Sequence, residues 1–170
     1  MKKLTPGLLA QFAVLIAMEV ILSRFLSINA WNLKIGFAFV PIAVAGMLFG
    51  ALPAGVIAAI ADLIGATLFP SGPFFPGFTL TAFLGGMVYG ALLHRARTPG
   101  RIAAAVCIRE LALSFVLNTL WISVLYGSDF FWLLIFGGRI IQCAAMIPVQ
   151  FVIITLLSGT LSRIKAHSKA

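Results

Sequence analysis

Acidic residues are scarce in this chain of 170 residues, which holds 4 Asp and Glu against 12 Lys and Arg. Three of the acids, Glu19, Asp62 and Glu110, fall in separate apolar segments. Catalysis inside a membrane requires paired acids, or a nucleophile with its base. The sequence therefore argues against an enzyme. Arg109 precedes Glu110 directly and is its expected charge partner.

Nucleotide-binding and metal-binding motifs are absent from the sequence. It has no G-x-x-x-x-G-K-[ST] stretch, which excludes ATP binding through a P-loop. It has no H-E-x-x-H stretch, and His94 and His167 lie in basic segments. Cys107 and Cys143 lie in apolar runs, where a thiol behaves as a small hydrophobic group. We expect no metal ion and no cofactor in this chain.

Long apolar runs dominate what is present. Hydrophobic residues make up 62% of the chain, and Asp62 is the one charged residue between Phe37 and Leu93. A water-soluble fold cannot hide such runs, because each of its helices or strands needs a polar side. Barrel strands alternate apolar and polar residues, whereas these runs are continuous. The sequence predicts a helical membrane protein with one domain, residues 1–170.

Glycine, proline and charged residues divide the apolar sequence into blocks that predict an all-α protein with six transmembrane helices. Blocks two to four are short for a bilayer, since about 15 to 17 residues rise only about 22 to 26 Å. The last block is long enough to bend at Pro148. The predicted spans are residues 7–27, 36–50, 53–69, 78–94, 102–126 and 130–162.

Basic residues predict the orientation of the chain in the membrane. With six spans, Lys2, Lys3 and the basic segments 94–101 and 163–169 share one side. Positive residues mark the cytoplasmic side, so we expect cytoplasmic termini and contact with membrane lipid. This placement accounts for the net charge of +8 without a nucleic-acid partner.

Cations are also expected on the opposite, outer side, where Arg24, Lys34 and Arg139 lie. A charge inside a bilayer costs several kcal/mol unless it is paired or solvated, so unpaired cations predict a polar cavity for an anion. The alternative is that Arg24 and Lys34 reach lipid headgroups and that Arg139 pairs with Asp62 or Glu19.

Aromatic residues gather on the same side, and a belt at the membrane interface explains many of them. Asn118, Thr119 and Trp121 differ because they lie within an apolar helix, where an amide must find a partner. Cations, an amide and aromatic rings together suit a flat, anionic, hydrogen-bonding small molecule. The loop 70–77 holds three prolines and two glycines, which predicts either a rigid lid or a structural turn.

Small residues recur at helical spacing on several spans. On the first span, Ala10, Ala13 and Ala17 form a smooth face, which suits internal packing or an external helical partner. On the fourth span, Gly86 and Gly90 allow another helix to approach closely, and we expect them to pack internally.

Several motifs together resemble a known family. The most specific are Phe-Phe-Pro-Gly-Phe-Thr at 74–79 and Asn-Thr-Leu-Trp at 118–121, accompanied by Lys-Ile-Gly-Phe at 34–37 and Asp-Leu-Ile-Gly at 62–65. Over residues 8–160 or so, the chain resembles the substrate-binding S-component of energy-coupling factor vitamin transporters, specifically the folate type.

This resemblance implies a protein of the prokaryotic cell membrane that captures folate from outside with high affinity. It would then dock on a transmembrane coupling subunit and two ATPase subunits, which use the ATP, and topple to release its cargo inside. The alanines Ala10, Ala13 and Ala17 resemble the family's docking surface. The alternatives are another vitamin, such as riboflavin, thiamine or a pterin-like precursor, or a stand-alone channel or scaffold subunit.

The resemblance also implies a folate site, in which aromatic rings hold the pterin, Asn118 supplies an amide and cations bind the two carboxylates of the glutamate tail. Gln142 departs from the family pattern, where a basic residue is expected, and this bears on affinity or on preference among folate forms. The implied substrate-binding residues are Arg24, Lys34, Phe74, Phe75, Phe78, Thr79, Asn118, Trp121, Arg139 and Gln142.

Overall fold

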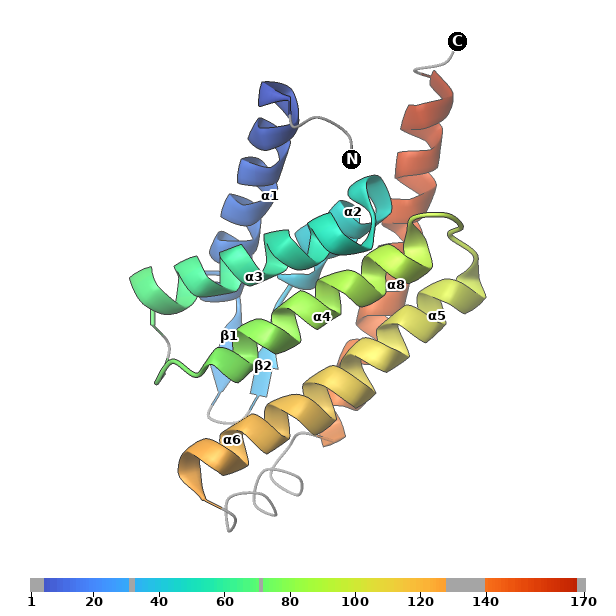
Figure 1. Cartoon of the computed structure of the whole chain (residues 1–170). Coiled ribbons are helices and arrows are strands. Elements are labelled where there is room, and N and C mark those ends of the chain that lie inside the picture. Colours follow the sequence, from blue (N-terminus) through green and yellow to red (C-terminus); the bar gives the residue numbers. More distant parts are fainter. Residues whose placement is uncertain (1–4, 31–32, 71, 128–139, 168–170) are drawn as a thin grey trace.

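A computed structural model describes residues 5–30, 33–70, 72–127 and 140–167, with side chains except in 28–35 and 164–167. The described elements are helices apart from one short hairpin (Figure 1). In chain order they are α1 (Pro6–Arg24), β1 (Ile28–Ala30), β2 (Leu33–Ile35), α2 (Phe39–Phe49), α3 (Ala51–Leu68), α4 (Pro76–Leu93), α5 (Pro99–Cys107), η1 (Ile108–Leu117), α6 (Asn118–Tyr126) and α8 (Ile140–His167).

Five described segments are long and apolar enough to cross a membrane: α1, α3, α4, the continuous stretch Pro99–Tyr126 and α8. The stretch Pro99–Tyr126 comprises α5, η1 and α6. The sixth segment, α2, has 11 residues and is therefore only about 16 Å long. The predicted all-α membrane fold is confirmed, and so is the shortness of its second helix. The third and fourth helices were predicted to be short as well, which is wrong, because α3 and α4 have 18 residues each and are long enough to span.

The observed bounds differ from the predicted spans at both ends of the chain. The sequence predicts a first span that reaches residue 27, whereas α1 ends at Arg24 and a hairpin occupies the connection to α2. The two strands pair antiparallel, with Asn29 opposite Lys34. The predicted start of the last span at residue 130 lies outside the described residues, and α8 continues through Pro148.

Local sequence explains where several helices begin. Thr5 caps α1, because its side chain accepts a hydrogen bond from the amide of Leu8, and Pro6 follows in the first helical position. Proline also opens α4 at Pro76. Gly50 separates α2 from α3 with a φ of 91°, which a residue with a side chain rarely adopts, so the chain can reverse there abruptly.

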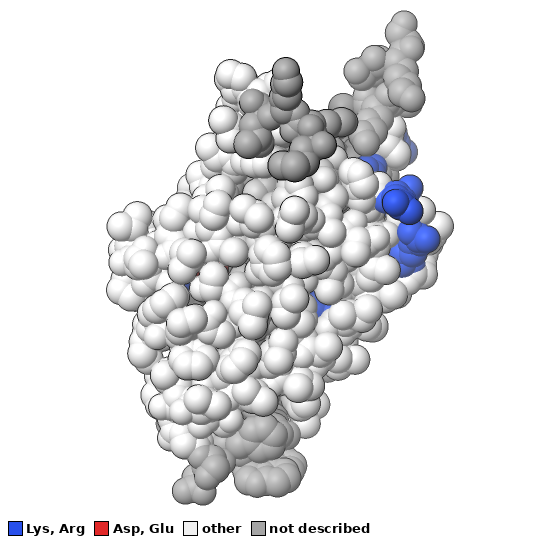
Figure 2. Space-filling view, viewed as in Figure 1, with Lys and Arg blue, Asp and Glu red and all other residues white. Residues whose placement is uncertain are grey.

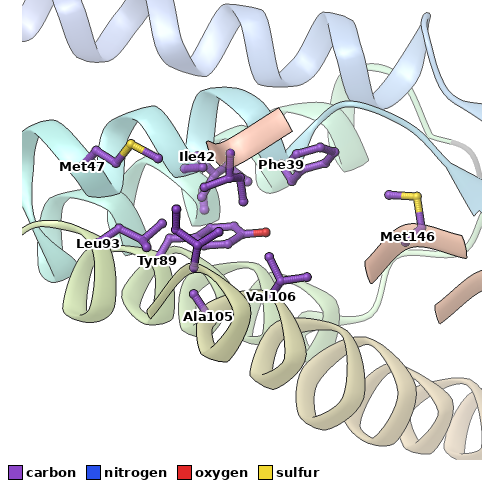
Figure 3. Packing of buried hydrophobic residues seen from close by; sticks show 12 residues of the cluster. Phe39, Ile42, Met47, Tyr89, Leu93, Ala105, Val106 and Met146 are labelled. Carbon is purple, nitrogen blue, oxygen red and sulfur yellow. The ribbon is translucent and has the colours of Figure 1, made fainter. Parts of the chain in front are cut away.

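The main core lies where α2, α4, α5 and α8 meet (Figure 3). Phe39 and Ile42 of α2 face Tyr89 of α4, and each of the three is at most 3% exposed. Lipid tails are as apolar as a protein core, so helices in a membrane gain little by burying apolar side chains against one another. Close packing therefore holds such helices together.

Glycines on α4 let that helix pack tightly on its neighbours. A side chain at Gly86 would overlap the carbonyl of Ala54 in α3, and one at Gly90 would overlap the backbone of Ala51. Gly46 of α2 meets the backbone of Gly90 in the same way. The predicted internal packing of Gly86 and Gly90 is therefore confirmed.

Most of the charge on the face seen in Figure 2 lies at its right edge, and the rest of this face is almost entirely uncharged. The basic side chains gather beside the loop between α4 and α5, which carries Arg95 and Arg97, and beside the first turn of α5, which carries Arg101. The start of α1 and the end of α8 lie toward this end of the bundle (Figure 1). We call the opposite end, where α1 runs into β1 and α4 begins, the hairpin end.

Candidate substrate-binding site

A cluster of polar side chains from three helices lies toward the hairpin end. Thr79 of α4 donates a hydrogen bond from Oγ1 to Oδ2 of Asp62 in α3, at 2.7 Å. Nη2 of Arg24, the last residue of α1, lies 3.8 Å from Oδ1 of the same carboxylate. The side chains of Arg24 and Asp62 are 11% and 22% exposed. This hairpin-end cluster thus joins α1, α3 and α4 around one accessible carboxylate.

The expectation that Arg24 is an unpaired cation is wrong, because Asp62 is its partner. The two residues come from helices that are not adjacent in the sequence, so no local pattern could reveal the pair. Sequence reasoning left Asp62 out of the site. Its one signal was that it is a solitary charge in a long apolar run, where an ionised side chain requires a function or a partner.

An aromatic cluster lies beside the first turns of α4. The ring centroid of Phe75 is 5.6 Å from that of Trp121 in α6 and 6.2 Å from that of Phe78. Nε1 of Trp121 donates to Oγ1 of Thr81 at 3.0 Å, and that hydroxyl donates to the carbonyl of Gly77. The indole N–H is therefore used inside the protein, and the ring itself is what Trp121 can offer a ligand.

Asn118 begins α6, and its side chain is partly buried. Within the described part of the chain, Oδ1 of Asn118 and Oγ1 of Thr119 are buried without a hydrogen-bond partner. A buried polar atom left in this state costs about 1 to 3 kcal/mol. The carbonyl of Asn118 is therefore suited to a ligand that brings a hydrogen-bond donor.

The remaining predicted site residues differ in exposure, and two of them cannot be compared. Phe74 is 47% exposed in the loop before α4, unlike the half-buried Phe75 and Phe78. Gln142 is 7% exposed in the first turn of α8. The side chain of Lys34 and the whole of Arg139 lie outside the described residues.

A second polar cluster, which we call the inner network, lies within the helices. Oε1 of Glu110 accepts from Nη1 of Arg109 at 3.2 Å and from Nε2 of Gln150 at 2.7 Å. The hydroxyl of Tyr89 donates to Oε1 of Gln150 at 2.7 Å. Glu110 is 2% exposed, and Tyr89 and Gln150 are fully buried. The predicted pairing of Arg109 with Glu110 is confirmed.

The inner network fastens an unusual segment of backbone. Arg109 and Glu110 belong to η1, a π-helix of 10 residues between α5 and α6. The guanidinium of Arg109 lies 5.5 Å from the ring centroid of Tyr89, and Sγ of Cys143 donates to the carbonyl of Glu110 at 3.7 Å. These contacts attach η1 to α4 and α8. Asn118, the first residue of α6, follows η1 directly.

The alanine face predicted for docking is solvent-exposed in the isolated chain. Ala10, Ala13 and Ala17 are all exposed on α1. A hollow of about 340 Å³ lies between α1 and α2 beside Ala10. It is lined by Ala10, Gln11, Val14, Leu15, Leu48 and Phe49.

Comparison with known proteins identifies the family. The model of the family described as "ECF transporter, substrate-specific component" matches residues 8–158. The chain belongs to this family. It is therefore a multi-pass membrane component of a transporter and not an enzyme. Among the residues that the structure describes, no three His, Cys, Asp or Glu side chains come together as a metal site.

The chain is also similar to individual members of the family. Folate transporter FolT of Clostridium novyi (strain NT) is 36% identical over 155 residues, 91% of this chain and 88% of the relative. Folate transporter FolT of Leuconostoc mesenteroides subsp. mesenteroides is 34% identical over 143 residues, 81% of this chain and 77% of the relative.

Solved structures agree with these relatives. The crystal structure of FolT bound with folic acid matches with a TM-score of 0.84 and 36% identity, covering 90% of this chain and 94% of that one. The S component of a bacterial ECF transporter matches with a TM-score of 0.53 and 22% identity, covering 94% and 95%. The second match shows the shared fold alone.

Proposed function

We propose that this chain is the high-affinity folate-binding subunit of an ATP-driven importer of the energy-coupling factor type, in the plasma membrane of a prokaryote. It captures folate at the extracellular side, with both termini in the cytoplasm. The main support for this proposal is the match to FolT bound with folic acid, at 36% identity over 90% of the chain.

The chemistry of the hairpin-end cluster supports folate as the ligand. The pterin ring presents a ring N–H next to an amino group, and a carboxylate can accept both donors through its two oxygens. Asp62 offers such a carboxylate, held by Thr79 at 2.7 Å and only loosely by Arg24 at 3.8 Å. We assign Asp62 to the pterin, as an addition to the residues predicted from the sequence.

The other site residues fit the rest of the molecule. Phe75, Phe78 and Trp121 offer ring faces to the pterin or the aminobenzoyl ring. The orphaned carbonyl of Asn118 accepts from a ligand N–H. In this proposal the two carboxylates of the glutamate tail bind the remaining predicted residues, Lys34, Arg139 and Gln142, with Phe74 on the exposed rim.

Calorimetry on the purified chain tests the proposal directly. We expect tight binding of folate without ATP, because the chain needs no energy input to capture its ligand. Riboflavin serves as the matched control, since it is also a flat vitamin but lacks the glutamate tail, and it should give no heat. Absence of folate binding, together with another vitamin copurifying with the chain by mass spectrometry, would replace the proposed substrate.

Release inside is proposed to follow docking on a transmembrane coupling subunit that carries two ATPase subunits. Ala10, Ala13 and Ala17 provide the docking face, since small exposed side chains let a partner helix approach closely. We expect Ala13→Trp to abolish copurification with the coupling subunit and to leave folate affinity unchanged.

Val152→Trp is the control for this docking experiment, because Val152 is 55% exposed on α8, another helix of the bundle. It should retain the partner. Copurification that survives Ala13→Trp but not Val152→Trp would move the docking surface from α1 to α8.

A further inference from the structure

Two kinds of buried glycine can be distinguished among the residues that the structure describes. At Gly86 and Gly90 an added side chain would overlap the backbone of α3, so these glycines set the distance between helices. At Gly65 and Gly77 an added side chain would instead overlap the side chains of residues already placed in the candidate site. A clash with a side chain moves that side chain, whereas a clash with backbone moves a whole helix.

Gly65 lies beneath the side chain of Arg24. A Cβ at this position would stand 2.6 Å from Nε of Arg24 and 3.2 Å from its Cζ. Gly65 is three residues after Asp62 on α3, which places both residues on one face of that helix. The guanidinium therefore crosses α3 in the space above Gly65 to reach the carboxylate of Asp62. Its terminal atoms can move aside, so a methyl group here displaces Arg24 without separating α1 from α3.

Gly77 lies beneath the indole of Trp121. A Cβ at this position would stand 2.5 Å from Cδ2 of Trp121 and 2.6 Å from Cε1 of Phe75. The indole cannot slide along α4, because its N–H donates to Thr81 one turn further on. The missing side chain of Gly77 thus makes room for both rings of the aromatic cluster.

We propose that Gly65 and Gly77 are positioning residues of the binding site, in which the space left by each missing side chain seats Arg24 and Trp121 in the geometry that receives the ligand. The inference rests on the proposed function, because it assigns these two side chains to folate. It adds two positions without a side chain to those that determine affinity.

Double-mutant cycles test the proposal, because they measure whether the effect of each glycine on folate affinity depends on the side chain that it seats. A general packing role would show no such dependence. We expect Gly65→Ala to weaken folate binding about tenfold, within the range measured for coupled neighbours, at an unchanged melting temperature. In an Arg24→Ala background the same change should have no further effect, since the side chain it displaces is gone. Gly77→Ala should also weaken binding, and the part of its effect that acts through the indole should be lost in a Trp121→Ala background, which leaves only the clash with Phe75.

Other glycines of this chain supply the controls. Gly159→Ala should lower neither affinity nor stability, because nothing lies within 4 Å of its added Cβ. Gly86→Ala should lower the melting temperature, because it pushes α4 away from α3. Equal losses of affinity from Gly65→Ala with and without Arg24, or a fall in melting temperature as large as that of Gly86→Ala, would overturn the proposal.

Tryptophan fluorescence measured without folate tests this inference independently of the proposed function. With Trp31 and Trp132 replaced by Phe, the emission of Trp121 should shift in Gly77→Ala and stay unchanged in Gly159→Ala. If the parent chain binds no folate, the proposed function fails while this test still decides the seating of Trp121. An unshifted emission would overturn the role of Gly77 even in a chain that binds folate.

Discussion

The hairpin-end cluster and the inner network are built from the same chemistry, an arginine beside a carboxylate that a side chain from another helix also contacts. They differ in how completely the carboxylate is enclosed. The side chain of Asp62 is 22% exposed and its arginine lies 3.8 Å away, whereas the side chain of Glu110 is 3% exposed and its arginine lies 3.2 Å away.

This difference separates two uses of a buried charge. Oε1 of Glu110 already accepts two hydrogen bonds, and its amide partner Gln150 is itself held by Tyr89, so the inner network joins α4, η1 and α8. Asp62 has one firm hydrogen bond and one loose ion pair, and part of its surface is open. A guest with hydrogen-bond donors can therefore use Asp62 without breaking the contacts between the helices.

Removing the carboxylate of Glu110 from the inner network should have the largest effect, and this effect should be on the stability of the fold. Glu110→Ala leaves the guanidinium of Arg109 without its ion-pair partner among the helices, and breaking a buried pair in this way costs about 3 to 5 kcal/mol. Thermal unfolding in detergent without folate should show a large loss of stability. Glu110→Gln keeps an acceptor for Gln150 and should lose less. A melting temperature unchanged by Glu110→Ala would show that the inner network does not stabilise the fold, and would contradict the difference drawn between the two clusters.

Changing the hairpin-end carboxylate should act on binding instead. Asp62→Asn replaces one acceptor oxygen by a donor, which opposes the donors of the pterin. We expect folate affinity to fall about 30-fold, or about 2 kcal/mol, the low end for a broken charge pair because Asp62 is partly exposed. The melting temperature should stay close to that of the parent. Unaltered affinity in calorimetry would remove Asp62 from the site.

The smallest effect is expected from single hydroxyl groups. Thr79→Val removes the donor that orients Asp62, so folate affinity should fall about fivefold, the equivalent of one hydrogen bond of about 1 kcal/mol. Tyr89→Phe is the matched change in the inner network and should lower the melting temperature while leaving affinity intact. The opposite pattern would exchange the roles of the two clusters.

The helices were predictable from sequence because lipid demands long apolar runs with satisfied backbone, and that demand is local. The hairpin was not, since Ile28–Ala30 and Leu33–Ile35 are too short to show alternation and no Asn-Gly or Asp-Gly turn joins them. The π-helix η1 was also missed, because residues 108–117 carry a pattern that suits an α-helix equally well.

The candidate site was predictable only where its chemistry is local. Arg109 and Glu110 are neighbours in the chain, so their ion pair was foreseeable. The contact of Arg24 with Asp62 depends on how α1 packs on α3, which no spacing within the sequence encodes. The role proposed for Gly65 was hidden for the same reason, because an absent side chain carries no signal until its neighbour is known.

A structure of the chain with folate bound is the most direct test of the division between the two clusters. The account predicts the pterin donors within hydrogen-bond distance of Asp62, with the contacts among Tyr89, Glu110 and Gln150 unchanged from those described above. A ligand seated against Glu110, with Arg24 and Asp62 still facing each other and away from it, would contradict the account.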